Sequence, residues 1–287
     1  GVVCWGNHPA HTGFKYLIGG FYAATNFSSC GFGSIIPSDS ALTDLGYFLS
    51  GSRVSVQLRS DLLRFCTGVT NMGGFMSNCL YPGVIPADFL KYCTSVTSFY
   101  DAFSNNLITA IPPNLFRTNV AVTNFQYCFS GNSQLQLRPD VFYQDGEQAT
   151  RFLNKTMNFT NCFYRTGAYT SAQGTAPDLW NCDFGESITL DVAPVTDWAG
   201  GDTITGQTSG ATAIVVAKVS TYVYKIKKHL GGFTLGEVVG VTGNANKLAD
   251  QGGTRPIFTG TPISTGCFGG HTSATVSNYA DIPASWK

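Results

Sequence analysis

Residues 106–131 have the sequence NLITAIPPNLFRTNVAVTNFQYCFSG, and similar stretches recur along the 287-residue chain. Alignment on the VTNF core gives steps of 27, 27 and 26 residues between equivalent threonines, which are Thr43, Thr70, Thr97 and Thr123. A weaker copy precedes them at Ala24–Gly33, and another follows at Met157–Gly167. A fixed period of this length is typical of proteins that stack one small structural unit on the next. The repetition therefore predicts a stack in which each copy completes the core of its neighbour.

The parts of one unit favour a strand followed by a short helix. Leu107–Ile111 is a run of apolar and β-branched residues that ends at a proline, which is typical of a strand entering a turn. A proline also suits the first position of a helix. Apolar residues then recur at the spacing of one helical face; they are Val122, Phe125, Cys128 and Phe129. We therefore expect an α/β repeat, a solenoid with one strand plus a short helix in each repeat.

The repeat disappears after about residue 185, where the chain changes character. Residues 212–228, TAIVVAKVSTYVYKIKK, alternate at the period of strands. Glycines punctuate two similar stretches, Gly201–Gly206 and Gly236–Gly240, which indicates a small all-β module of two hairpin-like halves. Because residues after Cys267 return to the first style, we expect this module to be an insertion in the stack. The predicted division is an N-terminal cap at 1–22, a repeat solenoid at 23–185, the inserted β module at 186–262 and a closing segment of the solenoid at 263–287.

The stretch IPPNLFRTNVAVTNFQYCFSG, residues 111–131, resembles the BspA-like leucine-rich repeats of bacterial surface proteins and phage structural proteins. The resemblance covers roughly residues 23–184, where three adjacent copies keep both the proline-led half and the VT-N/S-F half. Residues 201–213, GDTITGQTSGATA, are similar to short β modules of phage virion proteins. These resemblances imply a leucine-rich-repeat solenoid that serves in adhesion, decoration or spacing, and they do not select one of these roles.

The nine cysteines include no CxxC pair, which argues against a zinc site. Cys30, Cys128 and Cys162 share one repeat position, while Cys66 and Cys93 share another. A free cysteine behaves as a small buried hydrophobe. We therefore expect a packing column, with disulfides between neighbouring units as the alternative.

The charge composition argues against nucleic-acid and membrane partners. The 17 Lys and Arg residues balance 17 Asp and Glu residues, so the formal net charge is zero. The chain therefore lacks a basic stripe for phosphates or a polybasic patch for a membrane, and no apolar run approaches the roughly 20 residues of a spanning helix. Tyr222–His229 is basic and aromatic and could stack single strands. We favour a solvated strand face there.

The search for chemistry finds no nucleophile elbow, phosphate-binding loop, zinc-protease helix or dinucleotide motif. His8 and His11 lack a third metal ligand nearby, and we interpret them as loop residues. Asp145 and Glu147 lie two positions apart in a turn-rich stretch, whereas glycosidases take their acid and base from separate elements. We therefore predict a protein that is not an enzyme and that has no cofactor and no metal.

The remaining candidate is the surface of the stack, since solenoids commonly bind partners on their strand face. We expect the exposed binding groups to be Thr109, Gln134, Gln136 and Arg138. Three aromatic residues are expected to face the core or the neighbouring helix instead; they are Phe75, Tyr100 and Tyr127.

The leading hypothesis is a non-enzymatic phage virion protein, either a capsid decoration or head fibre or a tail-associated adhesion protein. Its expected partners are other virion subunits and a host cell-surface protein or glycan, and a homo-oligomer is expected for such a part. The alternative is a bacterial cell-surface leucine-rich-repeat adhesin. An enzyme acting on surface polysaccharide is the third and least favoured hypothesis.

Overall fold

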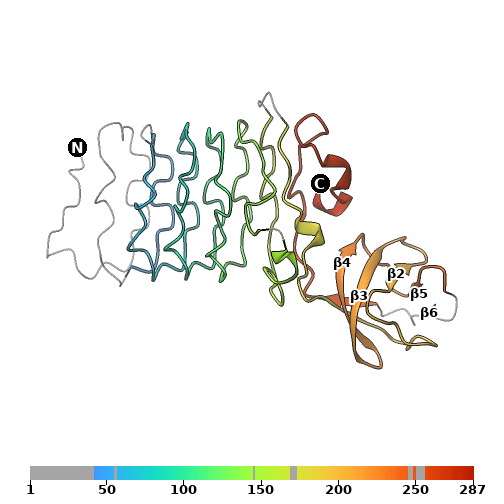
Figure 1. Ribbon diagram of the computed structural model, residues 1–287. Helices are drawn as coiled ribbons and strands as arrows, with labels where there is room; N and C mark the ends of the chain where they lie inside the picture. Colours follow the sequence, from blue (N-terminus) through green and yellow to red (C-terminus); the bar gives the residue numbers. More distant parts are fainter. Residues whose placement is uncertain (1–41, 55–56, 145, 169–172, 245–247, 250–255) are drawn as a thin grey trace.

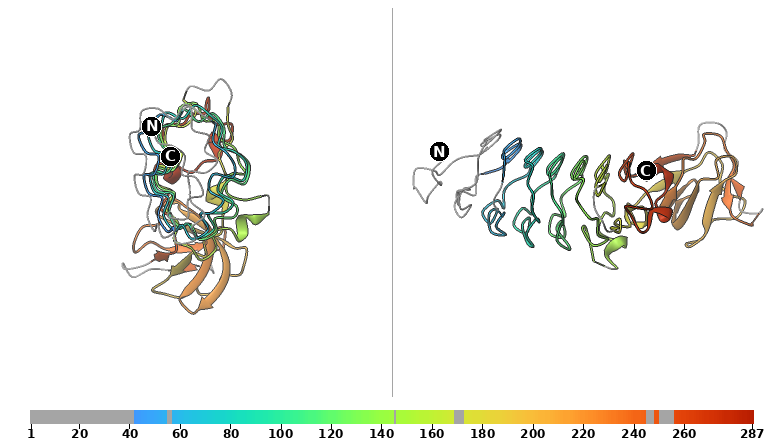
Figure 2. Two further views of the ribbon diagram at one scale, coloured as in Figure 1. Left: turned by 90° about the vertical axis from the view of Figure 1, so that its left-hand side faces the viewer. Right: turned by 90° about the horizontal axis from the view of Figure 1, so that it is seen from above.

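The computed structural model describes residues 42–54, 57–144, 146–168, 173–244, 248–249 and 256–287. Residues 42–184 and 263–287 form a stack of coils, in which one coil is one turn of the chain around the axis of the stack (Figure 1). An antiparallel sheet lies within residues 187–259. Viewed along the stack, successive coils superimpose (Figure 2). The predicted cap at 1–22 lies outside the described residues, as do the weak copy at 24–33, Cys30, His8, His11 and Asp145.

Each coil of the stack is joined to the next through its backbone. One position forms a parallel bridge from coil to coil, in the series Asp44, Asn71, Ser98, Asn124, Asn158 and Ile263. Beyond the bridge, every second backbone N–H donates to a carbonyl of the following coil. In one coil these bonds are Phe99 to Asn124 at 2.8 Å, Asp101 to Gln126 at 2.8 Å, Phe103 to Cys128 at 2.9 Å and Asn105 to Ser130 at 2.8 Å. The stack is therefore held by a ladder that runs along its axis.

The intervening N–H groups close turns within their own coil. The N–H groups of Cys128, Ser130 and Asn132 donate to carbonyls three residues earlier, at 3.0 to 3.3 Å. Tyr127 and Gly131 have φ of 58° and 75°, which suits the third residue of a type II turn. The left-handed φ of Gly131 favours glycine at this corner, and the equivalent corners of other coils are occupied by Asn78 and Asn105, a residue type that tolerates this conformation.

The predicted α/β leucine-rich-repeat solenoid, with one strand plus a short helix per repeat, is wrong. Within the described ranges there is no α-helix; the helical segments are three-residue 3-10 turns, namely η3 (Glu147–Ala149), η4 (Leu179–Asn181), η6 (Tyr279–Asp281) and η7 (Ala284–Trp286). The predicted strand at 107–111 is likewise reduced to a single bridge at Ala110.

The physical reason for the absence of a helix among the described residues is the choice of acceptor for the backbone hydrogen bonds. Val122, Phe125, Cys128 and Phe129 are fully buried, as the apolar spacing predicts. The N–H groups of Phe125 and Phe129 nevertheless donate to the next coil, to Asn158 and Cys162, both at 2.8 Å. In an α-helix they would bond four residues back within the same segment. The positive φ of Tyr127 also interrupts any helix there.

The recurring Asn of the VTNF core begins each coil with a side-chain-capped turn. Asn124 Oδ1 accepts the N–H of Gln126 at 3.0 Å, and Asn158 Oδ1 accepts that of Thr160 at 3.0 Å. Asp44, Asn71 and Ser98 accept the equivalent N–H in their own coils. Such local side-chain bonds favour turns over helices, so Asn124, which lies within the expected helical segment, instead starts a turn.

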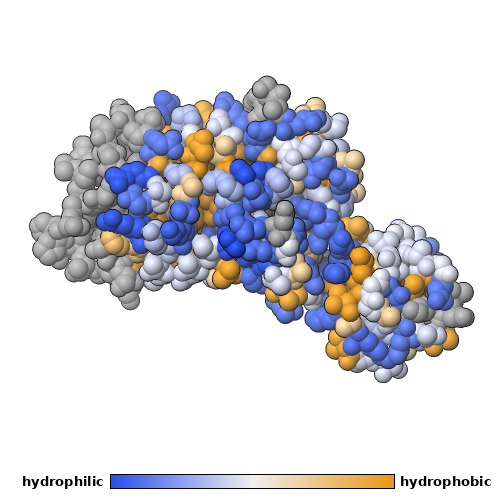
Figure 3. Space-filling model, viewed as in Figure 1, coloured by the Kyte–Doolittle hydropathy of each residue, from blue (hydrophilic) through white to orange (hydrophobic). Residues whose placement is uncertain are grey.

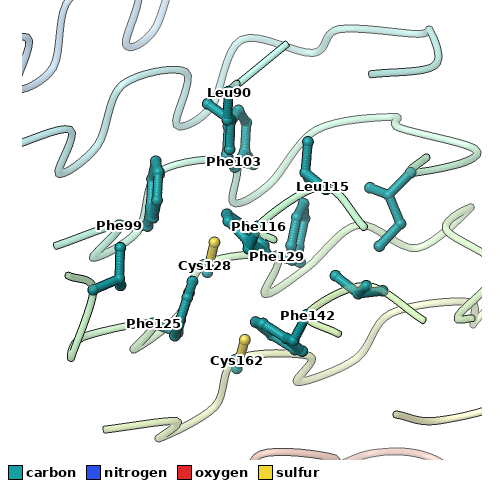
Figure 4. Packing of buried hydrophobic residues seen from close by; sticks show 14 of the residues in the cluster. Leu90, Phe99, Phe103, Leu115, Phe116, Phe125, Cys128, Phe129, Phe142 and Cys162 are labelled. Carbon is teal, nitrogen blue, oxygen red and sulfur yellow. The ribbon is translucent and has the colours of Figure 1, made fainter. Parts of the chain in front are cut away.

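Phenylalanine columns fill the interior of the stack (Figure 4). One column contains Phe99, Phe125 and Phe159, with ring centroids 6.0 and 5.7 Å apart and nearly parallel planes. A second contains Phe103, Phe129, Phe163 and Phe268, with centroids 5.5 to 5.7 Å apart. The seven described cysteines are free and buried, and Cys128 and Cys162 lie between the rings. For these seven the expected packing role is confirmed.

The sheet is built entirely from antiparallel pairs, in the order β6-β5-β2-β3-β4-β1-β7. Its strands are β1 (Ser187–Thr189), β2 (Thr203–Gly206), β3 (Thr212–Ser220), β4 (Val223–Leu230), β5 (Val239–Val241), β6 (Leu248–Ala249) and β7 (Ile257–Thr259). The two glycine-punctuated stretches meet in the pairing of β2 with β5. A separate small core, which includes Ile204, Trp198 and Tyr224, supports the sheet.

The chain returns from the sheet to the stack at Ile263. Ile263 forms the parallel bridge with Asn158, and the N–H of Phe159 donates to its carbonyl at 2.6 Å. Phe268 then continues the phenylalanine column, and its N–H donates to the Trp286 carbonyl at 2.8 Å. Residues 263–287 therefore supply the last coil of the stack and cover its end.

Replacing Asn132 with alanine should destabilise the stack more than the same change at Asn124. Asn132 is fully buried and its Nδ2 donates to the Phe103 and Phe129 carbonyls, both at 2.8 Å. Their loss should lower the free energy of unfolding by about 1–3 kcal/mol. Asn124 is half-buried, so water can replace its bond. Chemical denaturation measures both variants, and equal losses would contradict this distinction.

Candidate functional site

The structure brings together two of the four residues that were expected to bind partners. The N–H of Gln136 donates to the Thr109 carbonyl at 3.3 Å, so these residues lie on neighbouring coils. Both side chains are exposed, as is Gln134. Gln136 Nε2 also donates to the Gln173 carbonyl at 2.9 Å, which partly occupies its amide. These residues form a polar patch, although no strand underlies it.

Arg138 differs from the other three because its charge is already paired. Its Nη2 donates to Asp140 Oδ2 at 2.9 Å, and Nε contacts the second carboxyl oxygen at 2.5 Å. This bidentate contact holds the pKa of Asp140 below its usual value. Arg138 is therefore poorly suited to recognise an external anion, since a ligand would first have to displace Asp140.

A second exposed feature consists of Tyr47, Tyr100 and Tyr127, which we call the tyrosine column. Tyr47 is 43% exposed and Tyr100 is 36% exposed. The Tyr100 and Tyr127 rings meet edge to face with centroids 6.1 Å apart. Tyr47 lies across Gly74, where an added Cβ would come within 2.4 Å of its ring. The column therefore extends over several adjacent coils.

Tyr100 and Tyr127 were expected to face the core or the neighbouring helix, which is wrong, since neither belongs to the buried core and the described residues form no α-helix. Phe75 is fully buried, as expected. Tyr100 points outward because its neighbour Phe99 occupies the interior column. Tyr127 stands at a corner with positive φ and is half-buried. The sequence carried a signal for this position, since its counterparts include the glycine Gly74 and the aspartate Asp101, neither of which is typical of a core column.

Tyr224 and Lys225 of the basic and aromatic stretch, together with the nearby Lys218, make internal contacts. Tyr224 is buried, and its hydroxyl donates to Asp197 at 3.0 Å. Lys218 Nζ bonds the same carboxylate at 2.6 Å, and Lys225 Nζ donates to the Gly185 carbonyl at 2.9 Å. These contacts occupy Tyr224 and Lys225 of the stretch, whereas Tyr222 is exposed.

The described residues contain few arrangements suited to chemistry. In the ranges that the structure describes, no three His, Cys, Asp or Glu residues are placed to hold a metal. Glu147 forms an ion pair with Arg117 at 3.0 Å on the surface. No helix among the described residues is long and apolar enough to cross a bilayer.

The junction between stack and sheet holds a carboxyl and an imidazole that sequence patterns did not single out as a pair. The side chains of Glu186 and His229 are only 3% and 10% exposed, and Glu186 Oε1 lies 3.9 Å from His229 Nδ1. Burial raises the pKa of Glu186 to about 7 despite a hydrogen bond with Thr261, and the charge of Asp183 adds to this rise. Burial lowers the pKa of His229 to about 4. At neutral pH the imidazole is therefore uncharged.

Hydrophilic side chains cover most of the visible face of the stack, and hydrophobic ones gather on the sheet beside the junction (Figure 3). Comparison of the chain with protein-family models, curated proteins and solved structures finds no match.

Replacing Tyr100 with alanine should leave stability within about 0.5 kcal/mol, because an exposed ring contributes little to the core. Replacing the adjacent Phe99, which is fully buried, should cost about 3–5 kcal/mol. Urea unfolding of the two variants measures the difference. Similar losses would show that Tyr100 is part of the core.

Replacing Glu186 with glutamine should stabilise the protein more at about pH 8 than at about pH 5. The folded-state pKa of about 7 exceeds the usual 4.5, so the stabilisation from protonated Glu186 is present below 4.5 and lost as pH rises through 7. Because glutamine stays neutral, the variant should gain free energy of unfolding relative to wild type at high pH, with about 3 kcal/mol as the upper limit.

The matched control for this titration is Glu147→Gln, since the pKa of the surface Glu147 is lowered by hydrogen bonding to the Gln144 backbone. That variant should show no gain at high pH. Thermal denaturation across the pH range measures both. If the difference in melting temperature between wild type and Glu186→Gln stays constant from about pH 5 to about pH 8, the raised pKa of Glu186 is contradicted.

Proposed function

We propose that this chain is a non-enzymatic structural protein of a phage particle, and that its stack provides an extended contact surface. The observation that carries this proposal is the tyrosine column, in which the exposed rings of Tyr47 and Tyr100 and the half-buried ring of Tyr127 follow the axis of a stack held by backbone bonds. Tyrosine supplies a large contact area at low entropic cost, because its side chain has few rotatable bonds. A rigid row of such rings suits a partner that is itself extended or repetitive.

The spacing of the stack favours a regular partner. Coils joined by parallel bridges lie about 4.8 Å apart, as neighbouring strands do. The side chains Asp44, Asn71, Ser98 and Asn124 follow the same repeat and are half-buried. The surface therefore offers polar groups at one repeated spacing beside the tyrosine column, which fits a glycan chain or a row of identical protein subunits.

The phage setting is supported by the resemblance of residues 201–213 to short β modules of phage virion proteins. Within that setting, a capsid decoration, a head fibre and a tail-associated adhesion protein would each use such a surface. We propose other virion subunits and a host cell-surface protein or glycan as partners, with the chain present in several copies per particle.

Immunogold electron microscopy of particles and cells from the source culture tests the location, using antibody to this chain. The proposal expects label on particle heads or tails, and the position separates decoration from adhesion. Bare particles beside labelled bacterial surfaces would overturn the virion assignment and favour a bacterial surface adhesin.

A triple variant tests the contact surface. Replacing Tyr47, Tyr100 and Tyr127 with alanine should weaken binding at least tenfold, on the order expected for aromatic anchors of an interface. The assay is binding of the labelled full chain to host cells and to particles stripped of it. The matched control replaces the exposed polar patch, with Thr109→Ala, Gln134→Ala and Gln136→Ala. Loss in the control alone would place the contact on the polar patch instead.

A further inference from the structure

Five short segments from consecutive coils lie side by side along the stack, and together we call them the axial strip. Parallel bridges join the second residue of each segment to the second residue of the next, so equivalent positions form rows about 4.8 Å apart along the axis. The tyrosine column belongs to this strip. The segments are residues 43–47, 70–74, 97–101, 123–127 and 157–161.

The axial strip is almost free of charge. Its five segments contain no Lys or Arg, and their only acids are Asp44 and Asp101. Asp44 already accepts the Gly46 N–H at 2.7 Å and the Asn71 amide at 3.1 Å. Asp101 is half-buried, and this burial raises the pKa of its carboxyl. An acidic polymer would find no cation here, and a basic polymer would find only these two carboxyl groups, two coils apart.

The side chains that the axial strip exposes are polar or aromatic, and none is aliphatic. Its aliphatic, methionine and phenylalanine side chains are fully buried; they are Leu45, Met72, Phe99, Phe125, Met157 and Phe159. Threonines stand exposed at the start of three segments, namely Thr70, Thr97 and Thr123. Interfaces between proteins usually have a more apolar centre than this. The composition therefore favours a partner that is polar itself.

Polar groups beside the tyrosine rings retain capacity to bond a ligand. Ser98 Oγ accepts the Tyr100 N–H at 3.2 Å and can still donate its own hydrogen. Asn124 Oδ1 accepts a backbone N–H at 3.0 Å, which leaves its Nδ2 as a donor. Thr97 Oγ1 donates to a backbone carbonyl of the preceding coil at 3.1 Å, which leaves its oxygen as an acceptor. Donors and acceptors thus lie close together, as hydroxyl-rich ligands require.

The tyrosine rings supply the apolar part of the surface. Tyr47 lies across Gly74 of the next coil and is 43% exposed, while Tyr100 is 36% exposed. Tyr127 supports Tyr100 edge to face, with centroids 6.1 Å apart. Burial raises the pKa of Tyr100, and the neighbouring Asp101, Tyr47 and Tyr127 add to this rise, so its hydroxyl stays protonated at neutral pH. The rings therefore form an uncharged aromatic platform.

We propose that the axial strip binds a linear neutral polysaccharide, which lies along the axis of the stack. This inference rests on the proposed use of the stack as a contact surface and names the class of its partner. The apolar C–H face of a pyranose packs on the rings of Tyr47 and Tyr100. Its hydroxyl groups bond to the side chains of Thr97, Ser98 and Asn124. Because the rows repeat from coil to coil, successive sugar units meet similar groups.

The first test is binding of the full chain to purified polysaccharides, measured by affinity electrophoresis and isothermal titration calorimetry. The neutral probes are linear glucans, mannans and galactans with their oligosaccharides, and alginate and chitosan are the acidic and basic probes. At least one neutral glycan should bind. Its oligosaccharides should bind more tightly as they lengthen, because a longer chain reaches more coils of the strip.

Variants of exposed tyrosines locate the site. Tyr100→Ala should weaken binding at least tenfold, on the order expected for loss of an aromatic anchor. Tyr100→Phe keeps the ring and should retain most of the affinity. The matched control is Tyr222→Ala, because Tyr222 is 48% exposed on the sheet and lies outside the strip. The control should bind as wild type does, and all three variants should keep the wild-type near-ultraviolet circular dichroism.

Treated host cells distinguish a glycan from a protein as the partner. Mild periodate cleaves the vicinal diols of sugars, so it should abolish binding of the labelled chain to the cells. Digestion of the cells with protease beforehand should leave that binding intact. The reverse pattern would overturn the proposal and assign the axial strip to a protein.

Three further results would overturn the proposal. The first is a folded chain that binds none of the neutral glycans, and the second is glycan binding that Tyr100→Ala leaves intact. The third is tighter binding of alginate or chitosan, which would assign the strip to a charged polymer. These failures are separate from that of the phage assignment. Immunogold label on particles without glycan binding would sink this inference alone, whereas a glycan-binding chain found only on bacterial surfaces would sink the phage assignment alone.

Discussion

The structure depends on backbone hydrogen bonds that pass from each coil to the next at every second residue. In the coil that starts at Ser98, Phe99, Asp101, Phe103 and Asn105 donate forward, while residues between them close turns. Neither set is sufficient alone, because a single coil has no partner for its forward N–H groups and cannot cover its rings. Cooperation between neighbouring coils therefore underlies both the phenylalanine columns and the buried asparagines.

This constraint also explains how the sheet is attached. The ladder forms wherever backbone N–H and carbonyl groups of two adjacent coils face each other. The two coils can be far apart in the sequence. Asn158 accordingly forms a parallel bridge with Ile263, although all the strands of the sheet lie between these two residues in the sequence. The two crossing segments, near Gly185 and near Gly260, come together at the junction, and this is where Glu186 is buried. The burial of Glu186 is thus a consequence of joining two separately packed cores.

The period, the buried positions and the packing role of the described cysteines could be predicted from the sequence, because each depends on apolar residues that recur. The local conformation could not. Val122, Phe125 and Phe129 have a spacing that is compatible with one face of a helix and also with a series of turns. Either conformation would bury these three residues, which are fully buried in the structure. The distinguishing information was in Asn124, as a turn cap, and in the left-handed corners at Tyr127 and Gly131. The outward direction of Tyr100 follows from the turn backbone, which places the adjacent Phe99 in the interior column. The pairing of Glu186 with His229 joins distant segments, which no local pattern could reveal.

The most direct measurement of the ladder is residue-by-residue amide hydrogen exchange across residues 98–105. If the coils are joined as described, Phe99, Asp101 and Phe103 should exchange slowly, at rates near that of global unfolding. Tyr100, which is exposed and donates only to the Ser98 hydroxyl at 3.2 Å, should exchange much faster. Uniform protection through the segment, with Tyr100 as slow as Asp101, would indicate a continuous helix and would contradict the stack of turns.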